Sequence, residues 1–207
     1  DGTYRPASSD SSGGDRKILR QALSELQAAG YELRDDRLVK AATGEPLAFE
    51  IMVTTKEDER LALAYQRTLE RIGIEATIRT VDAAQYQQRR QAFDFDMIRN
   101  TWGVSLSPGN EQLNRWSSAA AGQEGSFNYP GAMDPAIDAM IQAMLSATSR
   151  EEFDAAVRAF DRVLISGYYV VPLFYLPDQW LARWTTIEHP ERTPLTGYQL
   201  PTWWAKQ

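Results

Sequence analysis

The spacing of apolar residues changes several times along the chain, and each spacing predicts one kind of element. After Asp15, apolar side chains recur on one helical face, at Ile18, Leu19, Ala22, Leu23 and Leu26. Asp15 is placed to cap this helix, and Gly30 is placed to end it in a left-handed conformation. The pattern therefore predicts an amphipathic helix between these two residues.

A strand, a helix and a second strand are predicted next. Apolar residues alternate from Leu47 to Val53 and again from Ile74 to Ile78, which is the period of a strand. Between them, apolar positions recur at helical spacing up to Gly73. This order predicts two parallel strands joined by a right-handed crossover. A short helix at residues 83–91 and a strand in "FDFDMIRN", residues 93–100, complete a predicted α/β layer structure.

Two further helices are predicted in the second half. Asp134 and Pro135 are suited to the cap and first turn of one helix. Ser149 and Glu152 form a capping box at the start of the other, which runs to Gly167. The short connection predicts an antiparallel pair.

The ends of the chain carry weaker patterns. Residues 1–14, rich in Ser, Gly and Asp, predict a flexible linker. "YYVVPLFYL" and "QWLARW", residues 168–176 and 179–184, predict strands, the first of them at an edge because of Pro172. Residues 189–207 show no readable period.

Composition narrows the class of protein. With 207 residues, 43% of them hydrophobic, the chain can bury one sizeable core or two small ones. The net charge of -6 argues against nucleic-acid binding. The absence of cysteine excludes disulfides, cysteine metal sites and a thiol nucleophile. No apolar run is long enough to span a bilayer, and no signal-peptide pattern opens the chain, so we expect a soluble mature product or a piece of something longer.

Candidate catalytic and metal-binding residues are few. His189 is the only histidine, lies before Pro190, and has no nucleophile motif to act with. Asp94 and Asp96 share one face of the predicted strand, so a hydrolase or a hard-cation site built on them is an alternative. No calcium loop or phosphate-binding glycine pattern occurs. We therefore expect a protein with no metal and no cofactor.

Tryptophans outside the predicted elements are the stronger functional signal. They are Trp102, Trp116, Trp203 and Trp204. Such residues either cover the ends of a sheet or contact a ligand or a protein partner, which leaves a protein-interaction module as another alternative. Residues 99–102 lie at the carboxyl end of the strand predicted in "FDFDMIRN", and open α/β sheets bind ligands at that edge. The sequence offers no role for Trp116.

Five ordered segments resemble the C-terminal half of the family 5 extracellular solute-binding proteins. They are "LRQALSELQAAGYEL", "YQRTLERIGIEATIRTVDAAQY", "FDFDMIRNTWGVSLSPGNEQ", "SFNYPGAMDPAIDAMIQAM" and "YYVVPLFYLP". The loop "WGVSLSPGNEQ" and the ending "TWWAKQ" are most similar to the YejA-like branch. The resemblance covers about residues 15–207, nearly the whole chain.

The resemblance implies the C-terminal lobe of a two-lobed periplasmic binding protein, with a mixed sheet flanked by helices. Residues 15–188 would form the lobe, and residues 189–207 would return toward the hinge and an absent N-terminal lobe. Its function would be binding a peptide or other small solute and delivering it to the membrane permease of an ABC importer. We expect a monomer that is periplasmic, or else extracellular and membrane-associated, and that is not an enzyme.

The resemblance also implies ligand-binding residues. The strand and loop at Trp102, Gly103, Val104 and Ser105 would offer main-chain hydrogen bonds to an extended peptide. Asn100, at the end of the same strand, is also expected to bind the ligand. Oligopeptide receptors carry an aspartate for the ligand amine at the position of Ser105, so this chain lacks that charge.

The resemblance implies a ligand contact for three more residues, and each of them also has a purely structural interpretation. Arg99 would face a ligand carboxylate, or else pair with Asp96 or another acid. Asn128 and Tyr129, in "SFNYPG", would lie near the cleft, or else form a rigid turn.

Overall fold

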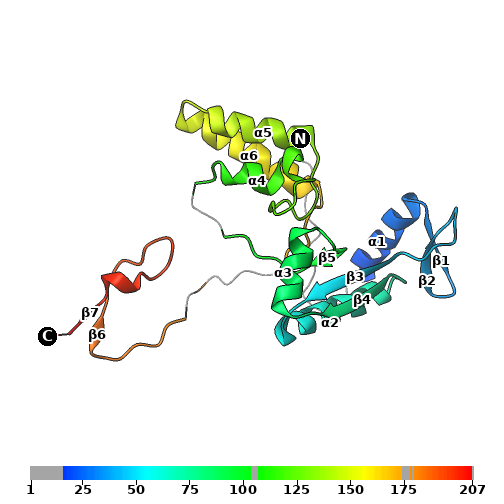
Figure 1. Cartoon of the computed structure of the whole chain (residues 1–207), viewed down its shortest axis with the longest axis horizontal. Helices are drawn as coiled ribbons and strands as arrows, with labels where there is room; N and C mark the ends of the chain where they lie inside the picture. The colour runs from blue at the N-terminus through cyan, green and yellow to red at the C-terminus, as the bar shows by residue number, and fades with distance from the viewer. Residues whose placement is uncertain (1–15, 104–106, 174–177, 179, 207) are drawn as a thin grey trace. The chain divides into compact units, whose positions relative to one another are not determined.

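The computed structural model describes residues 16–103, 107–173, 178 and 180–206 (Figure 1). The chain divides into two compact units, residues 1–169 and residues 170–207. Val104 and Ser105 lie outside the described residues. The same is true of the linker predicted at residues 1–14.

The first unit opens with the predicted helix and with a hairpin that was not predicted. Helix α1 (Arg16–Ala28) is followed by Gly30 at φ 88°, as expected for a left-handed end. Strands β1 (Tyr31–Arg34) and β2 (Arg37–Lys40) pair antiparallel. Asp35 and Asp36 form the turn with φ of 48° and 62°, a conformation that short polar side chains tolerate.

A three-stranded parallel sheet forms the centre of this unit. Strand β3 (Ala48–Val53) lies between β4 (Glu75–Thr80) and β5 (Met97–Ile98). Helix α2 (Lys56–Glu70) connects β3 to β4, and α3 (Ala83–Gln91) connects β4 to β5. The predicted parallel pair joined by a helix is confirmed, as is the α/β fold class.

The strand predicted at residues 93–100 is much shorter than expected. Only Met97 and Ile98 are in the sheet. Phe93 has φ 54° directly after α3, so residues 93–96 form the exit from a helix. Alternation of aromatic and acidic residues was therefore misleading here, because the chain was leaving a helix rather than pairing with a neighbour.

The sheet buries its apolar residues against α1 and α2. The buried members of this first core are Leu38, Ile51, Val53, Ala62, Leu69, Ile72, Ile74 and Ala76. Apolar residues of α1, among them Leu19 and Leu23, pack against them. Most of them are apolar positions of the predicted pattern, whereas Leu38 comes from the hairpin that was not predicted.

The predicted helix pair forms as expected. In α5 (Pro135–Ser146) the Asp134 carboxylate accepts from Ala136 N at 2.8 Å. In α6 (Arg150–Ser166) Ser149 and Glu152 make both hydrogen bonds of a capping box. Residues 147–149 reverse the chain, and the two helices lie side by side (Figure 1).

A second core forms around this pair and gives Trp116 a role. Helix α4 (Glu111–Trp116) and the 3₁₀ turn η1 (Ser118–Ala120) precede α5. Six residues are too few to show a helical period, which is why residues 111–116 were expected in a loop. Trp116 is only 9% exposed and packs with Ile137, Ile141 and Phe160. Trp116 is therefore a core residue.

The second unit contains a small hairpin. Strands β6 (Ile187–Glu188) and β7 (Trp204–Ala205) pair antiparallel, with the 3₁₀ turn η2 (Leu200–Thr202) between them. The strands predicted at residues 168–176 and 179–184 are wrong for residues 168–173 and 180–184, which are neither helix nor strand. The other predicted strand residues lie outside the described part of the chain.

Within the described ranges, no helix combines the length and apolar character needed to cross a bilayer.

Candidate ligand-binding site

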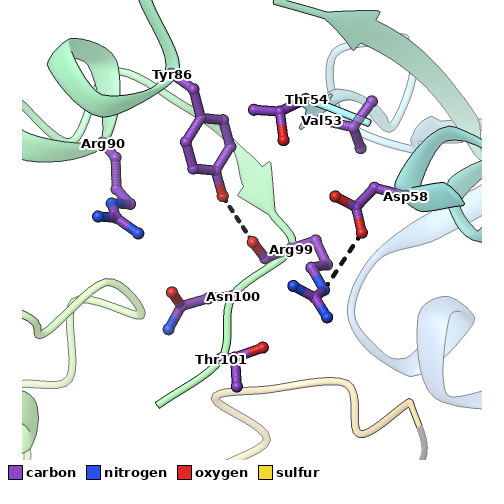
Figure 2. A pocket seen from close by; sticks show the side chains of 8 residues that line it. All are labelled: Val53, Thr54, Asp58, Tyr86, Arg90, Arg99, Asn100 and Thr101. Carbon is purple, nitrogen blue, oxygen red and sulfur yellow. Dashed lines mark hydrogen bonds and ion pairs between the residues drawn. The ribbon is translucent and has the colours of Figure 1, made fainter. Parts of the chain in front are cut away.

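A pocket of about 220 Å³ lies in the first unit where β3 and β5 end (Figure 2). Its lining comes from the ends of these strands and from α2 and α3: Val53, Thr54, Asp58, Tyr86, Arg90, Arg99, Asn100 and Thr101. After β3 the chain turns into α2 toward β4, whereas β5 lies on the other side of β3. Connections that diverge at the carboxyl edge leave a crevice, which is where open α/β sheets hold ligands.

Arg99 is paired with an acid inside this pocket. Its Nε lies 3.4 Å from Asp58 Oδ1, and Figure 2 shows the two side chains facing each other. The Asp58 side chain is 15% exposed and is held in the first turn of α2, whose N-cap Thr55 accepts from Asp58 N at 3.1 Å. The alternative that Arg99 pairs with an acid is thus observed, with Asp58 as the acid.

Tyr86 fixes the backbone of the same segment. Its hydroxyl donates to the Arg99 carbonyl at 2.6 Å across the pocket (Figure 2). Burial raises the pKa of Tyr86, so the phenol stays protonated and donating at neutral pH. The first residue after β5 is therefore anchored through both its side chain and its carbonyl.

Arg90 is a second cation of the lining, and it has aromatic neighbours in place of an acid. Its guanidinium carbon lies 5.7 Å from the ring centre of Tyr86 and 5.3 Å from that of Tyr129. One nitrogen, Nη2, donates to Gln87 Oε1 at 2.5 Å, and Nε is buried without an acceptor. Throughout the described ranges, no carboxylate forms an ion pair with Arg90.

In the segment that follows β5, two buried donors have no hydrogen-bond partner among the described residues. They are Asn100 Nδ2 and Trp102 Nε1. A buried donor that lacks an acceptor costs about 1–3 kcal/mol. An incoming carbonyl or carboxylate oxygen that reaches these groups would recover part of that free energy.

Trp102 joins the pocket segment to the second core. Its ring lies 5.4 Å from Trp116 and stacks at 6.3 Å on Tyr129, measured between ring centres. Trp116 in turn meets the edge of Tyr169 at 6.1 Å. The two tryptophans expected in a loop therefore differ. Trp116 belongs to the second core, and Trp102 lies between that core and the pocket.

Gly103 is less available than expected, because its carbonyl accepts from Arg115 Nη2 at 2.6 Å. This bond leaves its N–H as the group that a strand-like ligand could use. The other two residues of the expected peptide-binding stretch, Val104 and Ser105, are not among the described residues.

The Asn128 side chain is completely buried and holds a turn together. Its Nδ2 donates to Ser117 O and Ala132 O, and its Oδ1 accepts from Ala132 N, each at 2.9 Å. With these bonds made, the amide has little capacity left for a ligand. The geometry supports the rigid-turn alternative, and we leave Asn128 out of the ligand-contacting set. Tyr129, half-buried, stays in it through its contacts with Arg90 and Trp102.

Asp94 and Asp96 do not form the pair that a hydrolase would need. Asp94 is ion-paired with Arg89 at 2.9 Å, while Asp96 Oδ2 accepts from Glu50 N at 2.9 Å. The two carboxylates thus serve separate structural contacts rather than one face of a strand. In the part of the chain that the structure describes, no group of three or more acidic or histidine side chains could hold a metal ion.

Sequence reasoning missed Asp58, Tyr86 and Arg90. Two signals were present: Asp58 lies in the first turn of the helix that follows a strand, and Tyr86 and Arg90 are four residues apart on one helix. Neither signal is specific without knowing which strand ends lie side by side.

Comparison with known proteins gives a family match over residues 2–124, more than half of the chain, to "Bacterial extracellular solute-binding proteins, family 5 Middle". A relative from Brucella suis biovar 1 is 56% identical over 203 residues, 98% of this chain and 33% of the relative. The peptidoglycan-binding protein YepA of Agrobacterium fabrum is 50% identical over 203 residues, with the same coverage of 98% and 33%. The chain thus spans about a third of the length of these curated relatives.

The fold is shared with solved structures. The oligopeptide-binding protein AppA from Bacillus subtilis, in complex with a nonapeptide, superposes with a TM-score of 0.71 at 20% identity. The superposition covers 91% of this chain and 37% of AppA. The family match and this likeness in fold agree, and the chain belongs to the bacterial extracellular solute-binding proteins of family 5.

Proposed function

We propose that this chain is a substrate-binding part of an ABC importer, which holds an extended peptide or peptide-like solute in a cleft and delivers it to the membrane permease. The observation that carries the proposal is the pocket at the carboxyl edge of the sheet, with an unpaired cation and unsatisfied donors in and beside it. Such groups bind solute oxygens without any group placed to break a bond.

An extended peptide suits this edge for a physical reason. A peptide carries a carbonyl oxygen at every residue, and Asn100 Nδ2 and Trp102 Nε1 are donors without acceptors. Main-chain hydrogen bonds along the segment that follows β5 would hold peptides of many sequences, because strand addition uses the backbone for affinity. The likeness to AppA, solved with a nonapeptide, supports this class of ligand.

A peptidoglycan fragment is a second candidate. It is favoured by the 50% identity to YepA, which is named for peptidoglycan binding. The peptide stem of peptidoglycan would use the same donors, and its carboxylates would meet the positive charge of the pocket.

In the whole receptor, this chain would form one of two lobes. Residues 15–188 would form one lobe, and residues 189–207 would run toward the hinge, where Trp203 and Trp204 contact the N-terminal lobe. The receptor would act in the periplasm as a monomer. In the structure, Trp204 is 48% exposed, which fits a surface that meets further protein.

The test is peptide binding by a full-length receptor that includes this chain. A synthetic tetrapeptide pool is expected to raise the melting temperature, because a ligand that binds only the folded state stabilises it. Mass spectrometry of the retained fraction would then identify the bound peptides. A receptor that retains no peptide and no peptidoglycan fragment would contradict the proposal.

The isolated chain provides a matched comparison. With one wall of the cleft only, it is expected to bind the same pool weakly. Nanomolar affinity measured by calorimetry on the isolated chain would show that the other lobe is not needed.

A further inference from the structure

We propose that Arg90 is the residue of this pocket that recognises a carboxylate on the bound solute. Arg99, already paired with Asp58, would instead be a positioning residue for the segment after β5. The inference rests on the proposed function, because it assigns the charge selectivity of the same pocket.

The arginines near the carboxyl edge of the sheet differ in whether a carboxylate already balances their charge. Arg89 lies 3.1 Å from Glu50 and 2.9 Å from Asp94, and Arg99 lies 3.4 Å from Asp58. The lining contains one aspartate, Asp58, and two arginines, Arg90 and Arg99, so its net charge is +1. That charge is on Arg90, which has no carboxylate partner among the residues the structure describes.

Arg90 is also held in place without being neutralised. Tyr86 lies four residues earlier on α3, on the same face, and its ring is 5.7 Å from the guanidinium carbon. Tyr129 approaches at 5.3 Å from the turn before α5. Aromatic faces attract a cation but leave its charge and its N–H groups in place.

The two tyrosines do not supply the missing negative charge. Burial raises the pKa of both Tyr86 and Tyr129, so both phenols remain uncharged at neutral pH. Half-buried surroundings also weaken competition from water for the guanidinium, which strengthens its attraction for an anion.

The hydrogen-bonding capacity of Arg90 matches a carboxylate. A guanidinium has five N–H donors in a planar fork, and the structure uses one side of it for the neutral amide of Gln87. Gln87 is exposed, so its amide can move aside for a charged acceptor. A carboxylate accepting two parallel hydrogen bonds is the partner that this fork fits best.

The carboxylate could belong to the solute's carboxyl terminus or to an acidic side chain. Two tetrapeptide pools distinguish these sources, one with free carboxyl termini and one with amidated termini. In each pool, the enrichment of Glu over Gln among retained peptides reports side-chain recognition, and the ratio between the pools reports terminal recognition.

The experiment compares four forms of the full-length receptor that includes this chain: wild type, Arg90→Gln, Arg99→Gln and Arg89→Gln. The wild type is expected to favour carboxylate ligands, in one of the two arms, by about 10- to 150-fold. Arg90→Gln should abolish this preference, and Arg89→Gln, outside the lining, should keep it. Arg99→Gln leaves the Asp58 carboxylate unbalanced, so it should lower the preference by about three- to tenfold without abolishing it. Arg90→Lys retains the charge but not the fork, and is expected to keep part of the preference. Melting temperatures without ligand identify any variant that fails to fold.

Several outcomes would overturn the inference. They are a wild type without carboxylate preference, an Arg90→Gln variant that keeps it, and an Arg99→Gln variant that alone loses it. A change in unliganded stability without a change in selectivity would mean that Arg90 pairs with an acid of the receptor itself. Peptides retained without regard to carboxylates contradict this inference alone, whereas failure to retain any peptide contradicts the proposed function as well.

Discussion

Two polar segments of the first unit, residues 99–103 and residues 126–132, look alike in sequence and differ in the structure. Each was expected near a ligand, and each contains an asparagine followed by an aromatic residue within two positions. Asn128 makes three hydrogen bonds to protein groups, while Asn100 Nδ2 is buried with no acceptor. The difference teaches that one asparagine builds the fold, whereas the other keeps a donor that has no acceptor among the described residues.

Replacement of Asn128 is expected to have the largest effect on the stability of the fold. Asn128→Ala removes three hydrogen bonds and leaves Ser117 O, Ala132 O and Ala132 N without their partner. We expect a loss of about 3–5 kcal/mol in the free energy of unfolding, measured by urea denaturation. Asn110→Ala is the matched control, since Asn110 makes no side-chain capping bond, and should change stability by less than about 0.5 kcal/mol. Equal effects at the two positions would remove the structural role given to Asn128.

Trp102 tests how the pocket segment is attached to the second core. Trp102→Ala removes ring contacts with Trp116 and Tyr129 and should lower stability by about 2 kcal/mol, because the residue is only partly buried. Trp102→Phe keeps a ring and removes the unpaired Nε1, so it should lower stability by less than about 1 kcal/mol. Thermal and urea unfolding of both variants check this order, and a larger loss with Phe than with Ala would contradict it.

Replacing Asp58 would remove the acid that balances the charge of Arg99. Asp58→Asn leaves Arg99 without its acid, at a stability loss of about 1 kcal/mol or less for a partly exposed pair. In the full-length receptor, the additional net positive charge should strengthen binding of carboxylate peptides by about three- to tenfold. Calorimetry with free and amidated peptides measures the change. Weaker carboxylate binding would mean that Asp58 positions Arg99 for the ligand.

The smallest effect is expected at Asn100. Asn100→Ala removes a buried donor that makes no hydrogen bond, and the free energy gained by removing it offsets the lost packing of the side chain. The free energy of unfolding should therefore change by less than about 0.5 kcal/mol. Peptide affinity of the full-length receptor should nevertheless fall, as the donor is available to a solute carbonyl. A stability loss as large as that of Asn128→Ala would erase the contrast between the two segments.

Much of the fold could be predicted from local signals. The N-caps at Asp134 and Ser149 and the left-handed Gly30 act within one turn of a helix, and all three are confirmed. The hairpin at residues 31–40 was missed although Asp35 and Asp36 form a readable turn. The second-unit hairpin had no such signal, because Ile187 pairs with Ala205 across a long irregular connection.

The candidate site was predicted only in part, for a related reason. Position after a strand indicated Arg99, Asn100 and Trp102, but local pattern does not say which side chain is already satisfied. Asp58 comes from α2 and Arg90 from α3, and only the order of the strands brings both helices to one pocket. That Arg99 already has an acid partner could not be read from the sequence, because the partner, Asp58, lies 41 positions earlier in the chain.

By itself, the sequence determined the α/β class, the helix ends and the resemblance to family 5, since these follow from periodicity, capping and ordered motifs. Tertiary structure alone decided that Trp116 is core, that Asn128 is fully hydrogen-bonded, and that Arg90 keeps an unbalanced charge. The physical reason is that the free energy of a polar or aromatic side chain depends on the partners folding brings to it, and those partners are distant in sequence.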